Sequence, residues 1–277
     1  MGCLWISVGC RRGAMIASDV VVHPTAIIHS GAKIGAGSQV GPYSIIGPRV
    51  VLGKNSWVGP HVVIEGITSF GTGNKIFQFA SIGSVPQDLK FRGEESTVEI
   101  GDDNTFREYV TIQPGTATGG MITKLGSKNL LMANSHVGHD CILGDRNIIA
   151  NCVGLSGHVT LGSGITIGGL SGVHQFVKLG DLAFIAGGAM VTQDVPPFCT
   201  VHGDRAQLAG LNEVGLSRNG FSEDDVRTMR KIYRALFSQK GLMKEKVAKV
   251  REEYGQAKGC ELIVQFVEKT ERGICRA

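Results

Sequence analysis

Aliphatic and aromatic residues recur every six positions along most of the chain. The series begins at Val22 and runs to Ile82, resumes in the same phase at Ile100, restarts after one extra residue at Leu125 and ends at Val191. An amphipathic helix needs apolar residues about 3.6 positions apart, and a half-buried strand needs strict alternation. A sustained period of six fits neither element alone and is typical of a parallel β-helix.

The other positions of each six-residue unit support this interpretation. Glycine often follows the aliphatic residue, as in Ile34-Gly35, and a small residue such as Ser38 or Ser135 stands four positions after it. Glycine suits a chain that must turn, and a small side chain suits a tight place in a core. Three units of six residues form one coil, so residues eighteen apart are expected to stack.

The C-terminal part of the chain has a different pattern. Val195 is followed by two consecutive prolines, Pro196 and Pro197. They predict the end of the repeat, because proline cannot continue a strand ladder. Ser222, followed by three acidic residues, predicts a helix start, and two further helices are expected around residues 244–254 and 261–270.

These patterns predict a mainly β chain with three parts. Residues 1–14 form an extension of uncertain status, in which the apolar stretch precedes the charges, unlike a targeting signal. Residues 15–205 form the parallel β-helix, and residues 206–277 form a small α-helical domain.

Composition narrows the function classes. The net charge is +4 without a dense basic run, which argues against nucleic-acid binding. Seven cysteines without C-x-x-C spacing argue against a disulfide framework or zinc module and favour a reducing, cytoplasmic compartment. The sequence contains no apolar run long enough to predict a membrane span.

Two segments interrupt the repeat and are expected to project from the β-helix as loops. They run from Gln87 to Glu95 and from Pro114 to Gly120, and the first concentrates charged residues. Because loops on a rigid scaffold often carry functional groups, both are candidate parts of a site.

The eighteen-residue period brings a set of polar residues together. His139, Gly157 and Gln175 fall on one line, with Asp140 and His158 beside it. His139 is suited to accept a proton near neutral pH, and the Gly157 N–H is suited to stabilise an oxyanion. Asp140 can orient the imidazole only if the chain turns a corner there, since adjacent residues of a regular strand point to opposite sides.

Two other interpretations of the histidines remain at this stage. A histidine on a β-helix is often a plain turn or stacking residue. Three imidazoles are also the zinc ligands of related β-helix carbonic anhydrases, but the spacings of His136, His139, His158 and His174 do not resemble that arrangement. We therefore expect neither a metal nor another cofactor.

Several strings together resemble the UDP-N-acetylglucosamine acyltransferases of lipid A synthesis. They are QFASIG, QDLKFRGE, NLLMANSHVGHDC, LSGHV, VHQF and QDVPPF, and the resemblance covers Met15 to the C-terminus. It implies a left-handed β-helix, a homotrimer with each site between two subunits, and no metal. The implied reaction transfers a 3-hydroxyacyl chain from acyl carrier protein to the glucosamine 3-position of a UDP-sugar, the first step of lipid A biosynthesis.

The resemblance also implies residue roles. His139 matches the general base, Asp140 its orienting partner and Gly157 the oxyanion donor. Gly187 matches the place where a bulky residue would shorten the acyl groove, which implies a long acyl chain. The residues that match substrate contacts are Asp88, Lys90, His136, His158 and Gln175, together with Asn212 and Arg218 at the nucleotide. Val214 stands where the family often has an acidic residue, beside Glu213.

Other functions remain open on the sequence alone. The same transfer to the 3-amino analogue of the sugar would make an amide, and nothing in the residues separates the two acceptors. A hexapeptide acetyltransferase that uses acetyl-CoA is disfavoured by the QDLK loop and the helical tail. A β-helix without catalysis predicts that His139→Ala leaves function intact.

Overall fold

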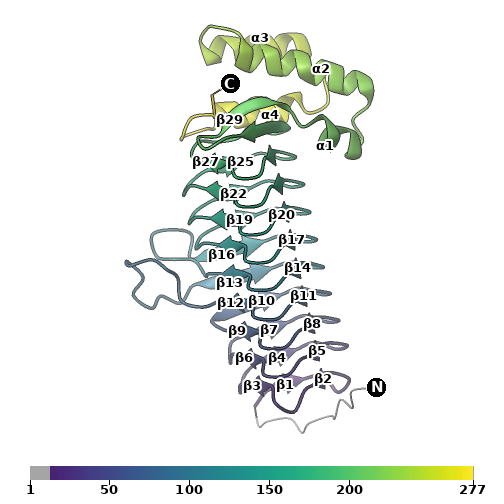
Figure 1. The fold of residues 1–277 in the computed structure, drawn as a ribbon, viewed down its shortest axis with the longest axis vertical. Helices are drawn as coiled ribbons and strands as arrows, with labels where there is room; N and C mark the ends of the chain where they lie inside the picture. The colour runs from purple at the N-terminus through teal and green to yellow at the C-terminus, as the bar shows by residue number, and fades with distance from the viewer. Residues whose placement is uncertain (1–12, 277) are drawn as a thin grey trace.

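The computed structural model describes residues 13–276, and most of them form a tall triangular prism of three parallel sheets (Figure 1). Sheet A contains nine strands, sheet B eleven and sheet C nine. From β1 to β27, consecutive strands lie in different sheets, and strands three places apart in the chain pair with each other. The described part thus has the parallel coils that the six-residue period predicts.

The strands of the three sheets are short, mostly two residues long. Sheet A comprises β1 (Met15–Ile16), β4 (Lys33–Ile34), β7 (Val51–Leu52), β10 (Ile67–Phe70), β13 (Thr97–Ile100), β16 (Ile122–Leu125), β19 (Ile142–Leu143), β22 (Thr160–Leu161) and β25 (Lys178–Leu179). Sheet B comprises β2 (Val21–Val22), β5 (Gln39–Val40), β8 (Trp57–Val58), β11 (Lys75–Ile76), β14 (Thr105–Phe106), β17 (Leu130–Leu131), β20 (Ile148–Ile149), β23 (Thr166–Ile167), β26 (Phe184–Ile185), β28 (Cys199–His202) and β29 (Gln207–Leu211). Sheet C comprises β3 (Ile27–Ile28), β6 (Ile45–Ile46), β9 (Val63–Ile64), β12 (Ser81–Ile82), β15 (Thr111–Ile112), β18 (His136–Val137), β21 (Gly154–Leu155), β24 (Gly172–Val173) and β27 (Met190–Val191).

In the two-residue strands from β3 to β27, the period-six residue is the buried one of the pair. In β20, for example, Ile149 is fully buried whereas Ile148 is 39% exposed, because successive strand residues point to opposite faces. Truncating one such buried isoleucine to alanine typically costs about 2–5 kcal/mol. The core is therefore a column of aliphatic side chains along the prism axis.

Most corners contain one residue with a left-handed backbone, which stands three positions after the buried aliphatic. Asp140, His158 and Phe176 occupy successive turns of one corner with φ values of 59°, 63° and 66°. The left-handed region is costly for residues other than glycine, so the stacked coils must hold these positions in place. The corner that Asp140 requires for its predicted role is present.

Buried asparagines form an amide ladder inside the prism. Asn104 donates through Nδ2 to the Oδ1 of Asn74 at 3.1 Å, and Asn129 donates to the Oδ1 of Asn104 at 3.0 Å. The backbone N–H of Asn147 continues the ladder by donating to Asn129 at 2.9 Å. These residues occupy the small position of their units, so polar atoms there are satisfied by the coil above or below.

The six-residue period ends near the prolines, as expected, but sheet B continues beyond them, which the sequence did not predict. Val195 still bridges Leu179 in parallel, and β28 continues sheet B beyond the prolines before β29 pairs with it antiparallel. Pro196 and Pro197 lie at the last corner, where their missing N–H groups leave no strand pair broken. The hairpin of β28 and β29 covers the end of the prism.

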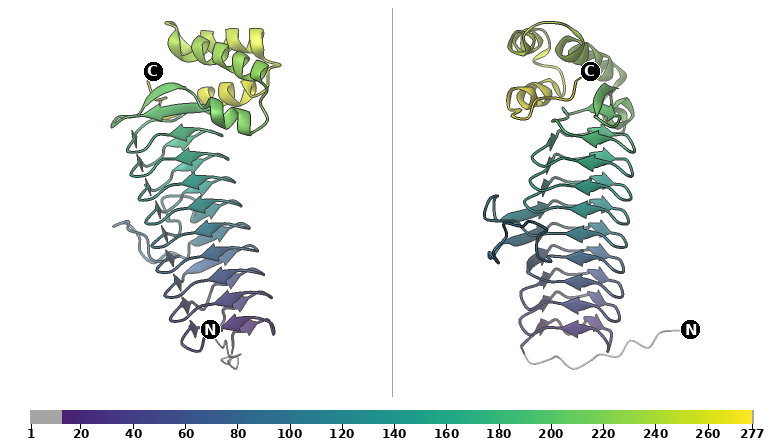
Figure 2. Two further views of the ribbon diagram at one scale, coloured as in Figure 1. Left: turned by 45° about the vertical axis from the view of Figure 1, so that its right-hand side comes forward. Right: turned by 60° about the vertical axis from the view of Figure 1, so that its left-hand side comes forward.

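Helices pack above this hairpin (Figures 1 and 2). The helix predicted at Ser222 is present as α2, with a capping box between Ser222 and Asp225, and the two further predicted helices correspond to α3 and α4. The helical segments are α1 (Glu213–Arg218), α2 (Glu223–Tyr233), the π-helical η1 (Arg234–Ser238), α3 (Met243–Tyr254) and α4 (Cys260–Glu268). Among residues 13–276, none of these helices is long and apolar enough to cross a membrane.

Candidate active site

Both interruptions of the repeat leave the prism at the same corner, between sheets C and A. The first lies between β12 and β13 and the second between β15 and β16, and they project together from the middle of the prism (Figures 1 and 2). The next coil brings His139 and Asp140 to that corner, between β18 and β19. The predicted loops and the predicted catalytic residues are therefore neighbours.

The predicted line of residues eighteen apart is present. His136 pairs in register with Gly154, and Gly154 with Gly172. At the corner that follows, His158 donates its backbone N–H to the carbonyl of His139 at 2.9 Å. One groove is lined by fifteen residues of this region: Gln87, Gln113, His136, Gly138, His139, Gly154, Leu155, Ser156, Gly157, Gly172, Val173, His174, Met190, Val191 and Thr192.

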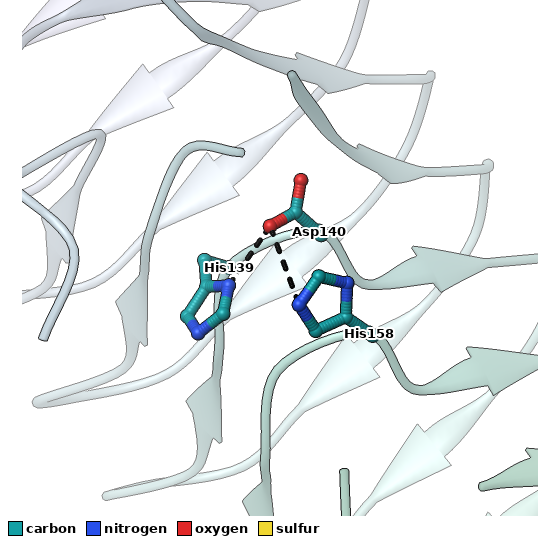
Figure 3. Close-up of side chains that lie close together, drawn as sticks. All are labelled: His139, Asp140 and His158. Carbon is teal, nitrogen blue, oxygen red and sulfur yellow. Dashed lines mark hydrogen bonds and ion pairs between the residues drawn. The ribbon is translucent and has the colours of Figure 1, made fainter. Parts of the chain in front are cut away.

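His139 and Asp140 form a hydrogen-bonded pair, shown in Figure 3. His139 Nδ1 lies 2.8 Å from Asp140 Oδ2, and the carboxylate side chain is 2% exposed. A carboxylate only accepts hydrogen bonds when ionised, so the imidazole donates through Nδ1 and its Nε2 is free to accept a proton. The geometry matches the predicted pairing of a base with its orienting group.

The second loop holds the Asp140 carboxylate. The Thr116 hydroxyl donates to Oδ2 at 2.6 Å, and the Thr116 N–H lies 3.0 Å and 3.1 Å from the two carboxylate oxygens. The Asp140 N–H donates to the Thr123 hydroxyl at 2.8 Å. A methyl group on Gly119 would lie 2.2 Å from the Asp140 carboxyl carbon, so only glycine fits there. This loop therefore fixes the partner of the candidate base.

Gly157 lies against the edge of the His139 imidazole. A β-carbon at this position would stand 2.5 Å from Cε1 and 2.6 Å from Nε2 of His139. Within the described residues the Gly157 N–H has no hydrogen-bond partner. The same corner position carries Pro48 in another coil, between β6 and β7, which shows that the coil does not need an N–H there. Gly157 lines the groove beside the candidate base.

His158 and His136 flank the pair. His158 Nε2 lies 3.9 Å from Asp140 Oδ2, and its ring stacks on Phe176 with centroids 4.3 Å apart. Burial lowers the pKa of His158, although the Asp140 charge opposes the shift. His136 Nδ1 lies 2.7 Å from the Thr111 hydroxyl. The pKa of His136 is lowered mainly by burial and to a smaller extent by the charge of the nearby His139. Both rings are thus favoured in their neutral form.

Asp88, Lys90 and Gln175, the other predicted residues of this region, are not among the residues that line the groove. The negative charge of Asp88 acts on His158 and favours its protonated form, which places the first loop near the pair. Lys90 is exposed on the same loop, and its N–H donates to Asp88 Oδ1 at 3.0 Å. Gln175 is exposed at the corner one coil beyond Gly157.

Asn212 and Arg218 lie elsewhere, in a second pocket over sheet B. Its lining includes Arg146, Phe184 and both predicted residues. Asn212 caps α1 by accepting from the Gly215 N–H at 2.9 Å, and its amide donates to the Leu182 carbonyl at 2.9 Å. Within one chain the nucleotide-contact candidates and His139 therefore line different pockets.

Two further positions bear on the predicted substrate contacts. Gly187 is exposed at the corner between β26 and β27 and lines neither pocket. Glu213, beside the unusual Val214, pairs with Arg230 through two hydrogen bonds of 2.5 Å and 2.7 Å. Glu213 is therefore already engaged and does not replace the acidic residue missing at position 214.

A metal ion would compete with these hydrogen bonds. His139, Asp140 and His158 offer ligand atoms that lie within 4.8 Å of one another. However, Asp140 Oδ2 already accepts from Thr116 and His139, and a metal between the three side chains would break the bond that orients His139. The donor set fits a proton-transfer pair better than a cation site.

Sequence reasoning missed residues that reach the groove from distant segments. Gln113 holds the first loop by accepting from the Gln87 N–H at 3.1 Å. Thr116 was visible as part of an interruption, but its bond to Asp140 spans 24 positions. The contact of Arg272 with His174 spans 98 positions and has no signal in the repeat.

Comparison with known proteins places this geometry in a family. The model for a UDP-N-acetylglucosamine O-acyltransferase domain matches residues 194–275, and the bacterial transferase hexapeptide model matches residues 31–66 and 122–157. LpxA from Acinetobacter baumannii has a similar structure, with a TM-score of 0.84 and 40% identity over 95% of this chain and all of that one. The match confirms the predicted left-handed parallel β-helix with a small helical domain.

Curated relatives agree with the structural match. The acyl-(acyl-carrier-protein)–UDP-N-acetylglucosamine O-acyltransferase of Anaeromyxobacter sp. strain Fw109-5 is 48% identical over 77% of this chain and 83% of its own length. The protein of the same name from Myxococcus xanthus is 50% identical over 76% of this chain and 82% of its own. The chain therefore belongs to the family of UDP-N-acetylglucosamine O-acyltransferases.

Proposed function

We propose that the chain transfers a 3-hydroxyacyl group from acyl carrier protein to the 3-hydroxyl of UDP-N-acetylglucosamine, the first step of lipid A biosynthesis. The observation that carries the proposal is the Asp140–His139 hydrogen bond of 2.8 Å beside the free Gly157 N–H. The names of the relatives, which specify an acyl carrier protein, a UDP-sugar and transfer to oxygen, support the substrates.

His139 acts as the general base. Its Nε2 takes the proton from the sugar hydroxyl as the oxygen attacks the thioester carbonyl, and Asp140 stabilises the imidazolium that forms. The tetrahedral intermediate collapses when the carbon–sulfur bond breaks, and His139 returns the proton to the leaving thiolate. The ester and the free carrier thiol balance the reactants without a metal or another cofactor.

Gly157 stabilises the negative charge that develops on the carbonyl oxygen. Its N–H has no partner within residues 13–276, and it lies beside the ring that accepts the proton. A donor that is already oriented costs no reorganisation in the transition state. His136, His158, Asp88, Lys90 and Gln175 are the candidate contacts to the sugar and the acyl chain.

The active unit is a homotrimer in which neighbouring copies complete each site. This arrangement accounts for the separation of the two pockets, since the sheet C groove of one copy can face the sheet B pocket of the next. Arg218 would then reach the nucleotide bound at the His139 of a neighbour, with Asn212 beside it. Gly187 would lie along the acyl chain, where the lack of a side chain favours a long chain. The proposed setting is the cytoplasm.

Subunit mixing tests the shared site. His139→Ala and Arg218→Ala variants should each be inactive alone, whereas trimers reassembled from both should regain activity because some sites combine intact residues. No recovery in verified mixed trimers would contradict a site built from two copies. Two His139→Ala preparations with different tags provide the matched control.

Product analysis tests the reaction and the acceptor. The protein would be supplied with 3-hydroxyacyl carrier proteins of graded length and either UDP-N-acetylglucosamine or its 3-amino analogue. We expect an ester on the first sugar, formed fastest with a long chain. Preference for the amino sugar would replace the hydroxyl acceptor with the amide-forming alternative, and no transfer to either would reject the proposal.

A further inference from the structure

Residues 270–276, the last that the structure describes, are fastened to the last coil of the prism and are called here the C-terminal strap. Its anchor is Asp194, which is 1% exposed. Asp194 Oδ2 accepts from the Thr270 hydroxyl at 2.6 Å, its N–H donates to the Gly273 carbonyl at 2.9 Å, and its carbonyl accepts from the Cys275 N–H at 3.0 Å. The position of the strap on the prism is therefore well defined.

The strap brings Arg272 to the wall of the active-site groove. Arg272 Nε donates to the Thr192 carbonyl at 3.1 Å, and Nη2 donates to His174 Nδ1 at 3.1 Å. Both Thr192 and His174 line the same groove as His139. A side chain from the end of the sequence thus contacts two residues of the groove wall.

The contact determines which nitrogen of His174 carries the proton. His174 Nδ1 also lies 3.2 Å from the Gln175 carbonyl, so a ring protonated at Nδ1 would donate to that oxygen. The Arg272 guanidinium can only donate, and therefore needs Nδ1 as an acceptor. The two arrangements exclude each other in a neutral ring, and the bond from the charged donor is the stronger. His174 then presents Nε2–H as its only donor.

We propose that Arg272 is a positioning residue of the active site, which holds His174 as the Nε2–H tautomer so that this N–H can bind substrate in the groove. The strap is accordingly part of the active site as well as a cap on the prism. The role in substrate binding rests on the proposed acyl transfer, whereas the tautomer assignment does not.

Histidine tautomers can be measured directly. Protein labelled with nitrogen-15 in histidine would be studied by long-range proton–nitrogen NMR correlation near pH 8. The signals of the His174 ring would be assigned as those that are missing from the spectrum of His174→Gln. We expect Nε2–H in the native protein and a shift toward Nδ1–H in Arg272→Gln, where the Gln175 carbonyl becomes the better partner. An unchanged tautomer in Arg272→Gln would overturn the proposal.

Steady-state kinetics test the consequence for substrate. Loss of a hydrogen bond from a charged donor predicts a fall of about tenfold or more in kcat/KM for Arg272→Gln, mainly through KM. The combined Arg272→Gln and His174→Ala variant should be no worse than His174→Ala, because both act through one ring. Glu271→Gln, in the same strap with its side chain 86% exposed, is the matched control and should retain native kinetics.

The possible results are distinct. A native kcat/KM in Arg272→Gln would overturn the positioning role even if the tautomer changes. So would a combined variant whose loss of kcat/KM equals the product of the losses in Arg272→Gln and His174→Ala. A fall in kcat/KM that Glu271→Gln shares would indicate a general loosening of the strap and would also overturn it. If the native protein transferred no acyl group, the proposed function would fail, and the tautomer measurement would still decide what Arg272 does to His174.

Discussion

The Thr116 hydroxyl lies 2.6 Å from Asp140 Oδ2, so an insertion in the repeat holds the carboxylate that orients His139. The loop reaches the carboxylate with one side chain and one backbone N–H. The proposed catalytic pair of His139 and Asp140 therefore depends on a segment outside the coils.

Thr116→Val tests this dependence. The substitution removes the hydroxyl and keeps the shape and the backbone N–H. A hydrogen bond to a charged group contributes about 1.5–3 kcal/mol, so kcat should fall by about tenfold to 100-fold while the fold is retained. Thr118→Val removes a hydroxyl that contacts Thr116 but not the carboxylate, and it should have a smaller effect. Equal effects of the two variants would argue against a specific role for the Thr116–Asp140 bond.

Gly157→Ala should abolish most activity without unfolding the protein. The new methyl group would lie 2.5–2.6 Å from the His139 ring, which must rotate away from Asp140 to relieve the contact. We expect a loss of about 100-fold or more in kcat, because displacing the ring forfeits the contribution of the general base. A thermal midpoint close to that of the native protein would separate this effect from unfolding.

Gly154→Ala is the matched control. Gly154 lines the same groove, but a β-carbon there would have no atom within 4 Å. We expect nearly native kcat for Gly154→Ala with short acyl donors. If both glycine variants lost activity equally, the contact between Gly157 and His139 would not be the cause.

Much of the fold could be predicted because the hydrophobic period sets the coil. The burial of Ile149, the stacking of Gly157 beyond His139 and the corner at Asp140 all follow from counting residues in sixes. The Asn104 ladder was not foreseen, since its satisfied amides depend on the coils on either side. Neither was the continuation of sheet B past Pro197, because the prolines lie at a corner rather than in a strand.

The candidate site shows the same division. Residues on the repeat, such as His139 and Gly157, could be placed from the sequence. Thr116 and Arg272 could not, because their contacts with Asp140 and His174 join segments whose separation has no relation to the period. Tertiary packing of the loop and the strap decides these contacts.

The pKa of His158 predicts a pH dependence of stability. Burial lowers this pKa below the unfolded value of about 6.5, so the unfolded chain binds more protons below that pH. The contribution of neutral His158 is present above about pH 6.5 and is lost as the pH falls toward the folded-state pKa. His158→Phe keeps a ring to stack on Phe176 and should flatten the decline of the thermal midpoint between pH 7.5 and 5.5. An unaltered decline would contradict this assignment.

Removal of metal ions should leave activity unchanged. Asp140 already accepts hydrogen bonds from Thr116 and His139, and the proposed proton transfer uses no cation. We expect native kcat after extended dialysis against a chelator. Elemental analysis of the purified protein should find a molar ratio of zinc to protein chains well below one. Stoichiometric zinc whose removal abolishes transfer would point to the His139, Asp140 and His158 cluster as a metal site instead.

The rate of acyl transfer under single-turnover conditions, compared between the native protein and His139→Ala, tests the central claim most directly. Removal of a general base should slow transfer from 3-hydroxyacyl carrier protein to UDP-N-acetylglucosamine by about 100-fold to 10,000-fold with the fold intact. Native transfer by a well-folded His139→Ala protein would contradict the account of the active site.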